Sequence, residues 1–165
     1  MAKIAIIIGS DSDLEIIQPC LDQLKTMDVD YELRVLSAHR TPDELKRFVK
    51  SAEKKGVKLF IAGAGLAAHL PGVIASHTIL PVIGVPLSGL AGGMDALLSM
   101  VQMPGGIPVA TMAVGKAGAK NAALFAVQVL AAADPKMKQA LLDYRKKMKI
   151  DLAAKEKKLH KLLGK

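Results

Sequence analysis

Short apolar runs alternate along this chain with longer segments in which apolar residues recur every three or four positions. The runs have the length of β-strands. We expect strands at Ile4–Ile8, Tyr31–Leu36, Val57–Ala62, Pro81–Val85 and Val109–Val114. The longer segments predict helices at Asp13–Met27, Pro42–Lys54, Ala67–Ser76, Gly93–Val101 and Gly118–Ala132. This alternation is typical of an α/β fold, in which crossover helices cover both faces of a parallel sheet.

The C-terminal segment follows a different pattern, with apolar residues at helical spacing and lysines between them. The apolar positions are Met137, Leu141, Tyr144, Met148, Leu152, Leu159 and Leu163. Residues 136–165 carry 11 basic and 3 acidic side chains, whereas residues 1–135 carry 12 of each, so this segment holds the whole net charge of +8. We expect a long, basic, amphipathic helix within residues 133–165. It packs either on its own domain or on a neighbouring subunit.

Composition and charge disfavour nucleic-acid-binding, membrane and secreted classes of protein. The basic helix is more typical of a solvated surface than of nucleic-acid or membrane binding, because aromatic residues make up 3% of the chain and tryptophan is absent. No apolar run reaches the roughly 18 residues of a membrane span, and Lys3–Ile8 is too short for a signal-peptide core. The single cysteine, Cys20, cannot form an internal disulfide, which fits a reducing cytoplasm. We expect one catalytic domain at residues 1–132.

The loop after the second predicted strand brings a titratable group and a permanent cation together. His39 and Arg40 follow Ser37, and a helix is expected to begin at Pro42. Ligands of open parallel sheets bind at the carboxyl ends of the strands, where this loop lies. A guanidinium can hold a phosphate or carboxylate, and an imidazole exchanges protons near neutral pH. The alternative is an exposed histidine beside an arginine that caps a local structure.

The loop after the first predicted strand reads Gly9-Ser10-Asp11-Ser12-Asp13. Hydroxyls and free amides at a helix start can hold an anion, and a carboxylate can accept hydrogen bonds from ribose hydroxyls. This combination fits a sugar phosphate. Alternatively, Ser12 or Asp13 only caps the helix. A magnesium-dependent phosphotransferase is disfavoured, because Gly9 and Ser10 separate the strand from the first carboxylate.

The loop after the third predicted strand is rich in small residues, which let a backbone approach a planar ligand closely. Its Gly63-Ala64-Gly65 lacks the third glycine and the acidic partner of a dinucleotide fingerprint, so NAD binding is disfavoured. We expect His69 to support the site rather than to act directly. Because the histidines lack the paired spacing of metal ligands, no metal is expected.

Several motifs together resemble, in order and spacing, the bacterial class I N5-carboxyaminoimidazole ribonucleotide mutases of purine biosynthesis (PurE). The motifs are Gly9-Ser-Asp-Ser-Asp13, Ser37-Ala-His-Arg-Thr-Pro42, Ala67-Ala-His-Leu-Pro-Gly72, Gly84-Val-Pro86, Val101-Gln-Met-Pro104 and Asn121-Ala-Ala-Leu124. The resemblance implies a flavodoxin-like three-layer α/β/α sandwich with a five-stranded parallel sheet. It also implies a homo-octamer that moves a carboxylate from the exocyclic N5 to C4 of the imidazole without metal or organic cofactor.

The resemblance also implies roles for individual residues. His39 would transfer protons as the catalytic acid and base. The positions that would bind the ribonucleotide are Ser10, Ser12, Asp13, Ser37, Arg40, Gly65, Ala67, His69 and Leu70. The chain departs from the mutase pattern at Leu66, where glycine is usual, and in the loop Gly89–Met94.

Two other functions stay open at the level of sequence. One is direct carboxylation of aminoimidazole ribonucleotide with free carbon dioxide, although the related animal-type enzymes tend to carry Ser-Asn after an Ala-Gly-Arg in the third loop, where this chain has Ala67-Ala68-His69. The other is a nonenzymatic nucleotide- or flavin-binding module on the same fold. The pairing of His39 with Arg40 and the scarcity of aromatic residues disfavour this module.

Overall fold

The structure, a computed structural model, describes residues 3–164. The strands within this range are β1 (Ile4–Ile8), β2 (Tyr31–Val35), β3 (Leu59–Ala64), β4 (Val82–Pro86) and β5 (Ala110–Thr111). The α-helices are α1 (Leu14–Thr26), α2 (Pro42–Lys54), α3 (Leu70–Ala75), α4 (Met94–Val101), α5 (Gly115–Ala131) and α6 (Pro135–Leu162). Short 3-10 helices, η1 (Asp11–Asp13) and η2 (Leu90–Gly93), precede α1 and α4.

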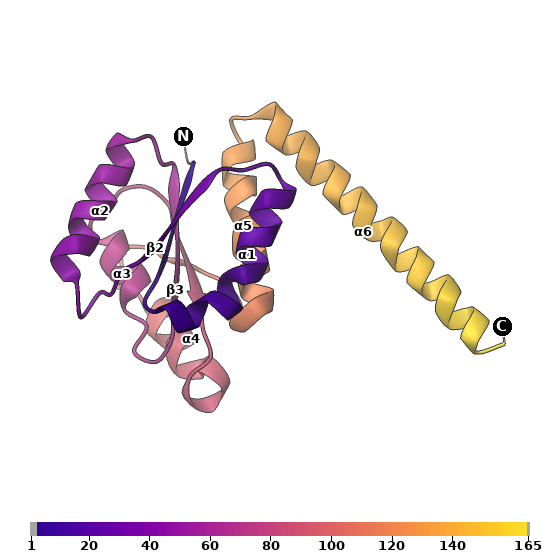
Figure 1. Ribbon diagram of the computed structural model, residues 1–165, viewed down its shortest axis with the longest axis horizontal. Coiled ribbons are helices and arrows are strands. Elements are labelled where there is room, and N and C mark those ends of the chain that lie inside the picture. The colour runs from indigo at the N-terminus through magenta and orange to yellow at the C-terminus, as the bar shows by residue number, and fades with distance from the viewer. Residues whose placement is uncertain (1–2, 165) are drawn as a thin grey trace. The chain divides into compact units, whose positions relative to one another are not determined.

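The strands form one five-stranded sheet in the order β2-β1-β3-β4-β5, and every neighbouring pair is parallel. This is the flavodoxin-like order, in which the connections reverse direction between β1 and β3. Figure 1 shows α2 and α3 on one side of the sheet and α1 on the other. The predicted three-layer α/β/α fold is therefore confirmed.

Apolar side chains on both faces of the sheet explain these layers. The isoleucines of β1 are fully buried, as expected for a strand covered on both sides. On one face, Phe60 packs in a cluster with residues of α2, α3 and α4. On the other face, Gly63 lies so close to Ile17 of α1 that an added Cβ would come within 2.8 Å of that side chain. The small residues of β3 therefore let α1 lie directly on the sheet.

The last strand is much shorter than the predicted Val109–Val114. β5 pairs with β4 only at Ala110 and Thr111, and Met112 then donates from its backbone to Gly84. By alternation, the next donor from β4 toward β5 would be residue 86. That residue is proline, which has no N–H, so the ladder ends there.

The third helix also begins later than predicted, at Leu70 instead of Ala67. Pro71 lies in the first turn of α3, where its missing N–H needs no partner, whereas in a helix from Ala67 its ring would clash with the Ala67 carbonyl. Leu66, just before the predicted start, has a positive φ of 55°. Residues 65–69 therefore form an irregular loop at the carboxyl end of β3. This loop contributes to the cavity described below.

The chain divides into two compact units, with the division after Ala126, inside α5. The second unit contains α6, whose N-terminus is capped by Asp134. The Asp134 carboxylate accepts hydrogen bonds from the backbone amides of Lys136 and Met137. No helix among residues 3–164 combines the length and the apolar content required to cross a membrane.

Candidate active site

A cavity of about 620 Å³ lies where the loops after β1, β2, β3 and β4 meet. It therefore occupies the carboxyl edge of the sheet beside the reversal point between β1 and β3, where open α/β sheets bind ligands. Its lining includes every residue that the sequence assigned to the site, namely Ser10, Ser12, Asp13, Ser37, His39, Arg40, Gly65, Ala67, His69 and Leu70. Residues that lie up to 60 positions apart in the chain thus share one cavity.

Two histidines form a direct hydrogen bond within this lining. Nε2 of His39 lies 2.8 Å from Nδ1 of His69, and the two rings stand nearly perpendicular, at 84°. One imidazole must donate and the other must accept, so the tautomer of one ring is linked to that of the other. Both side chains are exposed to the cavity. This pair is the feature of the site best suited to proton transfer.

A tight turn fixes the backbone that carries His39. The Ser37 hydroxyl accepts hydrogen bonds from the amides of His39 (3.3 Å) and Arg40 (3.1 Å). The Ser37 amide donates to the Thr41 hydroxyl at 2.9 Å, and Pro42 then begins α2. Proline suits this first helical position because its φ is already helical and it needs no amide partner. The imidazole is therefore presented by a preorganised loop, and Ser37 has a structural role in addition to lining the cavity.

A capping box holds the loop after β1. The Ser10 amide donates to the Asp13 carboxylate at 3.0 Å, while the Ser10 hydroxyl accepts from the Ser12 amide at 3.3 Å. Ser10 is therefore the N-cap of η1 and Asp13 is its reciprocal partner. Asp13 also occupies the N-cap position of α1, where its side chain makes no capping hydrogen bond. The same residues line the cavity. Helix capping and ligand binding are thus compatible at these positions.

Arg40 extends from its own loop to the loop after β1. Its Nη2 donates to the Gly9 carbonyl at 2.7 Å. Burial raises the pKa of the Asp13 carboxyl above its ordinary value of 3.8, whereas backbone hydrogen bonds from Ser10 and Gly9 and the charge of Arg40 act in the opposite direction. A cation and a carboxylate therefore stand at the same end of the cavity. They can bind an anion and a hydroxyl-bearing sugar, respectively.

The partly buried charge of Asp13 leads to a prediction about stability. When the pKa of a carboxyl is higher in the folded than in the unfolded protein, the folded protein loses stability as the pH rises through the folded-state pKa. We therefore expect Asp13→Asn to have a higher Tm than the unmodified protein at pH 7. Well below pH 3.8 the two Tm values should be equal, because Asp13 is then protonated in both the folded and the unfolded protein. Thermal unfolding across this pH range measures the effect. The control is Asp22→Asn, on the exposed surface of α1. A lower Tm of Asp13→Asn at neutral pH would contradict the prediction.

The cavity also contains lining residues that the sequence did not assign, namely Gly9, Ala38, Ala64, Leu66 and Ser88. Ser88 could have been found, because β4 is parallel to the other strands and the loop after it must open at the same edge. Leu66 was noted only as a departure from a sequence pattern. Its place in the lining depends on a backbone conformation that the sequence does not reveal.

The single cysteine does not line this cavity. Cys20 is fully buried in α1, and burial raises the pKa of its thiol to about 12, so the reactive thiolate does not form near neutral pH. Among residues 3–164, no group of three or more histidine, cysteine or acidic side chains lies close enough to hold a metal ion.

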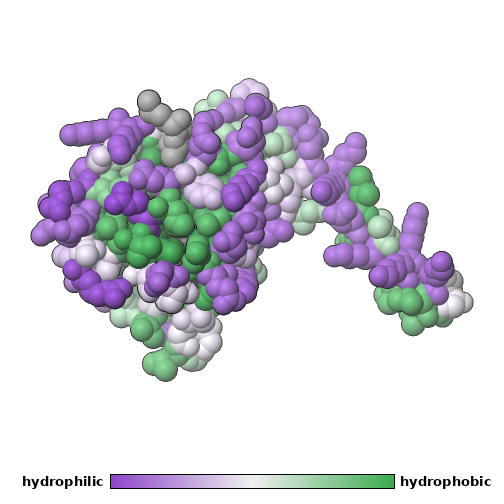
Figure 2. All heavy atoms as spheres, viewed as in Figure 1, coloured by the Kyte–Doolittle hydropathy of each residue, from purple (hydrophilic) through white to green (hydrophobic). Residues whose placement is uncertain are grey.

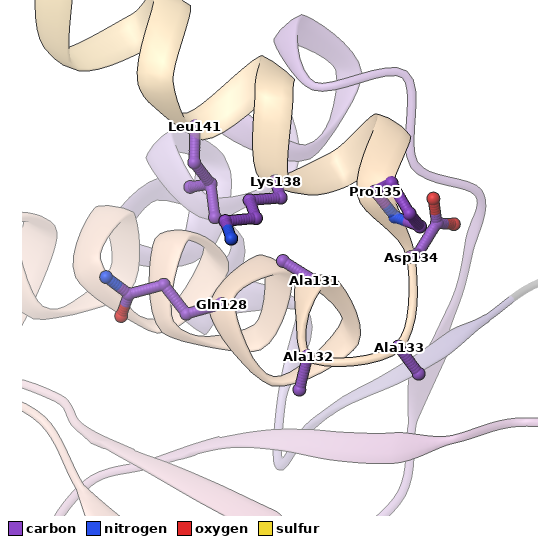
Figure 3. A pocket seen from close by; sticks show the side chains of 8 residues that line it. All are labelled: Gln128, Ala131, Ala132, Ala133, Asp134, Pro135, Lys138 and Leu141. Carbon is purple, nitrogen blue, oxygen red and sulfur yellow. The ribbon is translucent and has the colours of Figure 1, made fainter.

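A second cavity, of about 610 Å³, lies at the turn between α5 and α6 (Figure 3). Alanines form much of its lining, and its carboxylate, Asp134, already accepts two backbone hydrogen bonds. Its lining contains no histidine. This cavity therefore lacks the acid–base pair of the site at the carboxyl edge of the sheet.

Known proteins resemble the chain over nearly its whole length. The family model described as AIR carboxylase matches residues 3–151. A Pyrococcus abyssi protein named N5-carboxyaminoimidazole ribonucleotide mutase is 53% identical over 150 residues, which cover 90% of this chain and 85% of that protein. An Escherichia coli K12 protein of the same name is 52% identical over 146 residues, covering 88% of this chain and 86% of that protein.

Solved structures agree with these sequence matches. The crystal structure of Treponema denticola PurE is 28% identical in sequence and superimposes with a TM-score of 0.85, covering 94% of this chain and 97% of that one. The matched family region includes all the loops that line the cavity at the carboxyl edge of the sheet. The chain belongs to the AIR carboxylase family.

Proposed function

We propose that this protein is an isomerase of de novo purine biosynthesis that converts N5-carboxyaminoimidazole ribonucleotide to 4-carboxy-5-aminoimidazole ribonucleotide. The observation that carries the proposal is the hydrogen-bonded pair of His39 and His69, in one cavity with Arg40. An acid–base group beside an anion-binding group fits a phosphorylated substrate that must exchange protons at two atoms. The mutase names of the relatives support the same activity.

The lining residues divide into groups by chemistry. Arg40 and the hydroxyls of Ser10, Ser12 and Ser37 would bind the phosphate, because a guanidinium and nearby hydroxyls donate hydrogen bonds to its oxygens. Asp13 would accept hydrogen bonds from the ribose hydroxyls. The heterocycle would lie against the loop after β3, whose cavity-lining residues include Gly65, Ala67, His69 and Leu70. This arrangement leaves His39 to act on the ring.

The reaction needs only one proton carrier. Protonated His39 gives its proton to N5, the carbon–nitrogen bond of the carbamate breaks, and the bonding electrons stay on nitrogen, which releases carbon dioxide. C4 of the aminoimidazole then attacks carbon dioxide through its own electron pair and forms the new carboxylate. Neutral His39 removes the C4 proton, which restores the aromatic ring and the starting protonation state of the enzyme. The sequence of steps is balanced without metal or organic cofactor.

His69 would act as a positioning residue in this mechanism. If Nδ1 of His69 accepts from Nε2 of His39, the Nε2 proton stays in place whether His39 is charged or neutral. The proton that comes and goes is then the one on Nδ1 of His39. His69 would therefore select the nitrogen through which His39 exchanges protons with the substrate.

A comparison of substrates tests the proposed reaction. The purified protein is expected to convert the carbamate nucleotide directly, and aminoimidazole ribonucleotide with bicarbonate should react only to the extent that free carbon dioxide forms. Formation of the 4-carboxy product is followed by absorbance or chromatography. Efficient reaction of aminoimidazole ribonucleotide with carbon dioxide, and none with the carbamate, would establish direct carboxylation instead. Absence of both reactions would favour a nonenzymatic binding module.

We also propose that the protein works in the cytoplasm as a homo-octamer, with α6 packing on a neighbouring subunit. Residues 59–115 contain a single Asp, Glu, Lys or Arg residue, Asp95. Within this stretch, Met94, Leu98 and Val101 form an apolar stripe on α4 and are each about half exposed. Figure 2 shows hydrophobic side chains at the surface of the body where η2 and α4 lie. Exposed apolar side chains that adjoin one another are typical of sites of protein association.

The apolar positions of α6 support the same proposal. Met148, Leu152, Leu159 and Leu163 are each more than half exposed, and hydrophobic side chains stand among hydrophilic ones along α6 in Figure 2. A helix derives most of its stability from packing of its apolar face. A second subunit would supply that packing, and the catalytic domain would then be residues 1–132.

The assembly gives a prediction of its own. Leu98→Asp places a charge in the proposed interface, and an uncompensated buried charge costs about 3–5 kcal/mol. We expect this variant to dissociate to smaller species, measured by sedimentation velocity, while its circular dichroism stays that of a folded protein. Lys46→Asp, on the exposed surface of α2, is the control and should not change the assembly. A Leu98→Asp variant that sediments like the unmodified protein would exclude this interface.

A further inference from the structure

One residue of the cavity has a backbone conformation that its side chain disfavours. Leu66 has a φ of 55°, in the left-handed region where a Cβ crowds the backbone. Asparagine and glycine adopt this conformation readily, whereas leucine does so rarely. Such residues persist where the surrounding structure holds them, and they cluster at functional sites. The presence of a large side chain at this position therefore calls for a reason.

The place of Leu66 in the lining supplies one. The other apolar side chains of the lining are the small residues Ala38, Ala64 and Ala67, together with Leu70, which is buried at the start of α3. Leu66 is 63% exposed and lines the same cavity. It is thus a large, mostly exposed apolar side chain in a cavity otherwise lined by polar groups, small residues and the buried Leu70.

The backbone beside Leu66 is held in place by the next loop. Gly65 lies so close to the loop after β4 that a Cβ on it would come within 3.1 Å of the Ser88 carbonyl. The Leu87 amide donates to the Ala64 carbonyl at 2.9 Å, which ties the two loops together just before this point. Leu66 therefore follows a backbone segment that the loop after β4 holds in place.

We infer that Leu66 retains carbon dioxide in the cavity between its release from N5 and its capture by C4. This inference rests on the proposed function. Carbon dioxide is small and uncharged, whereas the charged and hydroxyl-bearing groups of the lining attract water into the cavity. An apolar side chain at the opening lowers the exchange of water and gas with solution. Leu66 would then lower the fraction of the carboxyl carbon that escapes before it reaches C4.

The experiment follows the carboxyl carbon. The carbamate nucleotide is labelled with ¹³C in the carboxyl group and converted in unlabelled bicarbonate with carbonic anhydrase, which equilibrates any gas that escapes. The unmodified protein should place most of the label in the product. Leu66→Gly should release several-fold more aminoimidazole ribonucleotide per product formed and should lose label in proportion. Its Tm should not fall, because glycine suits a φ of 55°.

Two further variants separate apolarity from conformation. Leu66→Met keeps an apolar side chain of similar volume and should retain the label, whereas Leu66→Asn tolerates the left-handed conformation but is polar, and it should leak. The role of Leu66 is overturned if Leu66→Gly releases no more aminoimidazole ribonucleotide per product than the unmodified protein. It is also overturned if Leu66→Met and Leu66→Gly lose equal amounts of label. If the unmodified protein forms no 4-carboxy product, the proposed function fails and this inference with it.

Discussion

Replacing His39 by asparagine is expected to lower turnover of the carbamate nucleotide by about 10²–10⁴-fold, the usual contribution of a general acid–base group. Asparagine can still donate a hydrogen bond toward His69 but cannot exchange a proton near neutral pH. The nucleotide should therefore bind with nearly unchanged affinity, because the phosphate and ribose contacts remain. Single-turnover kinetics measures the chemical step, and calorimetry with the product measures binding.

A matched substitution controls for the general effect of losing a histidine. His77 lies in a different cavity, with Lys50, Thr78 and Leu80, so His77→Asn should leave turnover nearly unchanged. Rates within a few-fold of each other for the unmodified protein and His39→Asn would show that another group carries the proton. Loss of both binding and turnover in His39→Asn would assign His39 to binding rather than to proton transfer.

The second large effect is expected on the binding of the substrate phosphate. Arg40→Ala should raise KM about 10- to 100-fold, because a hydrogen bond to a charged group contributes about 1.5–3 kcal/mol. The effect on kcat should be smaller, since the proton carrier is intact. Arg47→Ala is the control, because Arg47 pairs with Glu44 on the exposed surface of α2 and does not line the cavity.

A substrate without phosphate makes the test specific. If Arg40 binds the phosphate, the nucleoside should react poorly with the unmodified protein and no worse with Arg40→Ala. The loss of rate caused by removing the phosphate and the loss caused by Arg40→Ala would then not add, which a double-mutant cycle measures. Additive losses would show that Arg40 acts elsewhere, for example by holding the loop after β1 through Gly9.

The hydrophobic pattern was sufficient to predict most of the fold. The bounds of β1 and α2 agree with the sequence prediction, because β1 is a continuous apolar run and α2 begins at Pro42 with a strongly amphipathic sequence. The pattern could not limit β5, whose end depends on the missing N–H of Pro86 in the neighbouring strand. Nor could it place the start of α3, which depends on Pro71 lying in the first turn rather than on hydrophobicity.

The site was predictable to the extent that it depends on strand ends. Residues after parallel strands share one edge of the sheet, so the alternation of strands and helices places Ser10, Ser37 and Gly65 at that edge. The strand order β2-β1-β3 then makes their loops neighbours. The hydrogen bond between His39 and His69 could not be predicted, because it joins loops 30 positions apart and depends on how both rings are oriented. Similarly, the capping role of Ser10 instead of Ser12 is decided by local backbone geometry.

The sequence was least informative about α6. Its spacing predicts an amphipathic helix, and a helix spans Pro135–Leu162. An apolar stripe can pack against its own subunit or against another, and both arrangements use the same residues. The choice depends on the assembled surface rather than on the pattern of the helix.

The central claim is that His39 exchanges protons with the heterocycle while Arg40 holds the phosphate. A crystal structure of the protein with 4-carboxy-5-aminoimidazole ribonucleotide bound tests it most directly. The predicted result is a ring nitrogen of His39 about 2.6–3.2 Å from a polar atom at the reacting end of the ligand, with the phosphate at Arg40. A ligand bound with its ring out of reach of His39, or with its phosphate at the opposite end of the cavity, would contradict the claim.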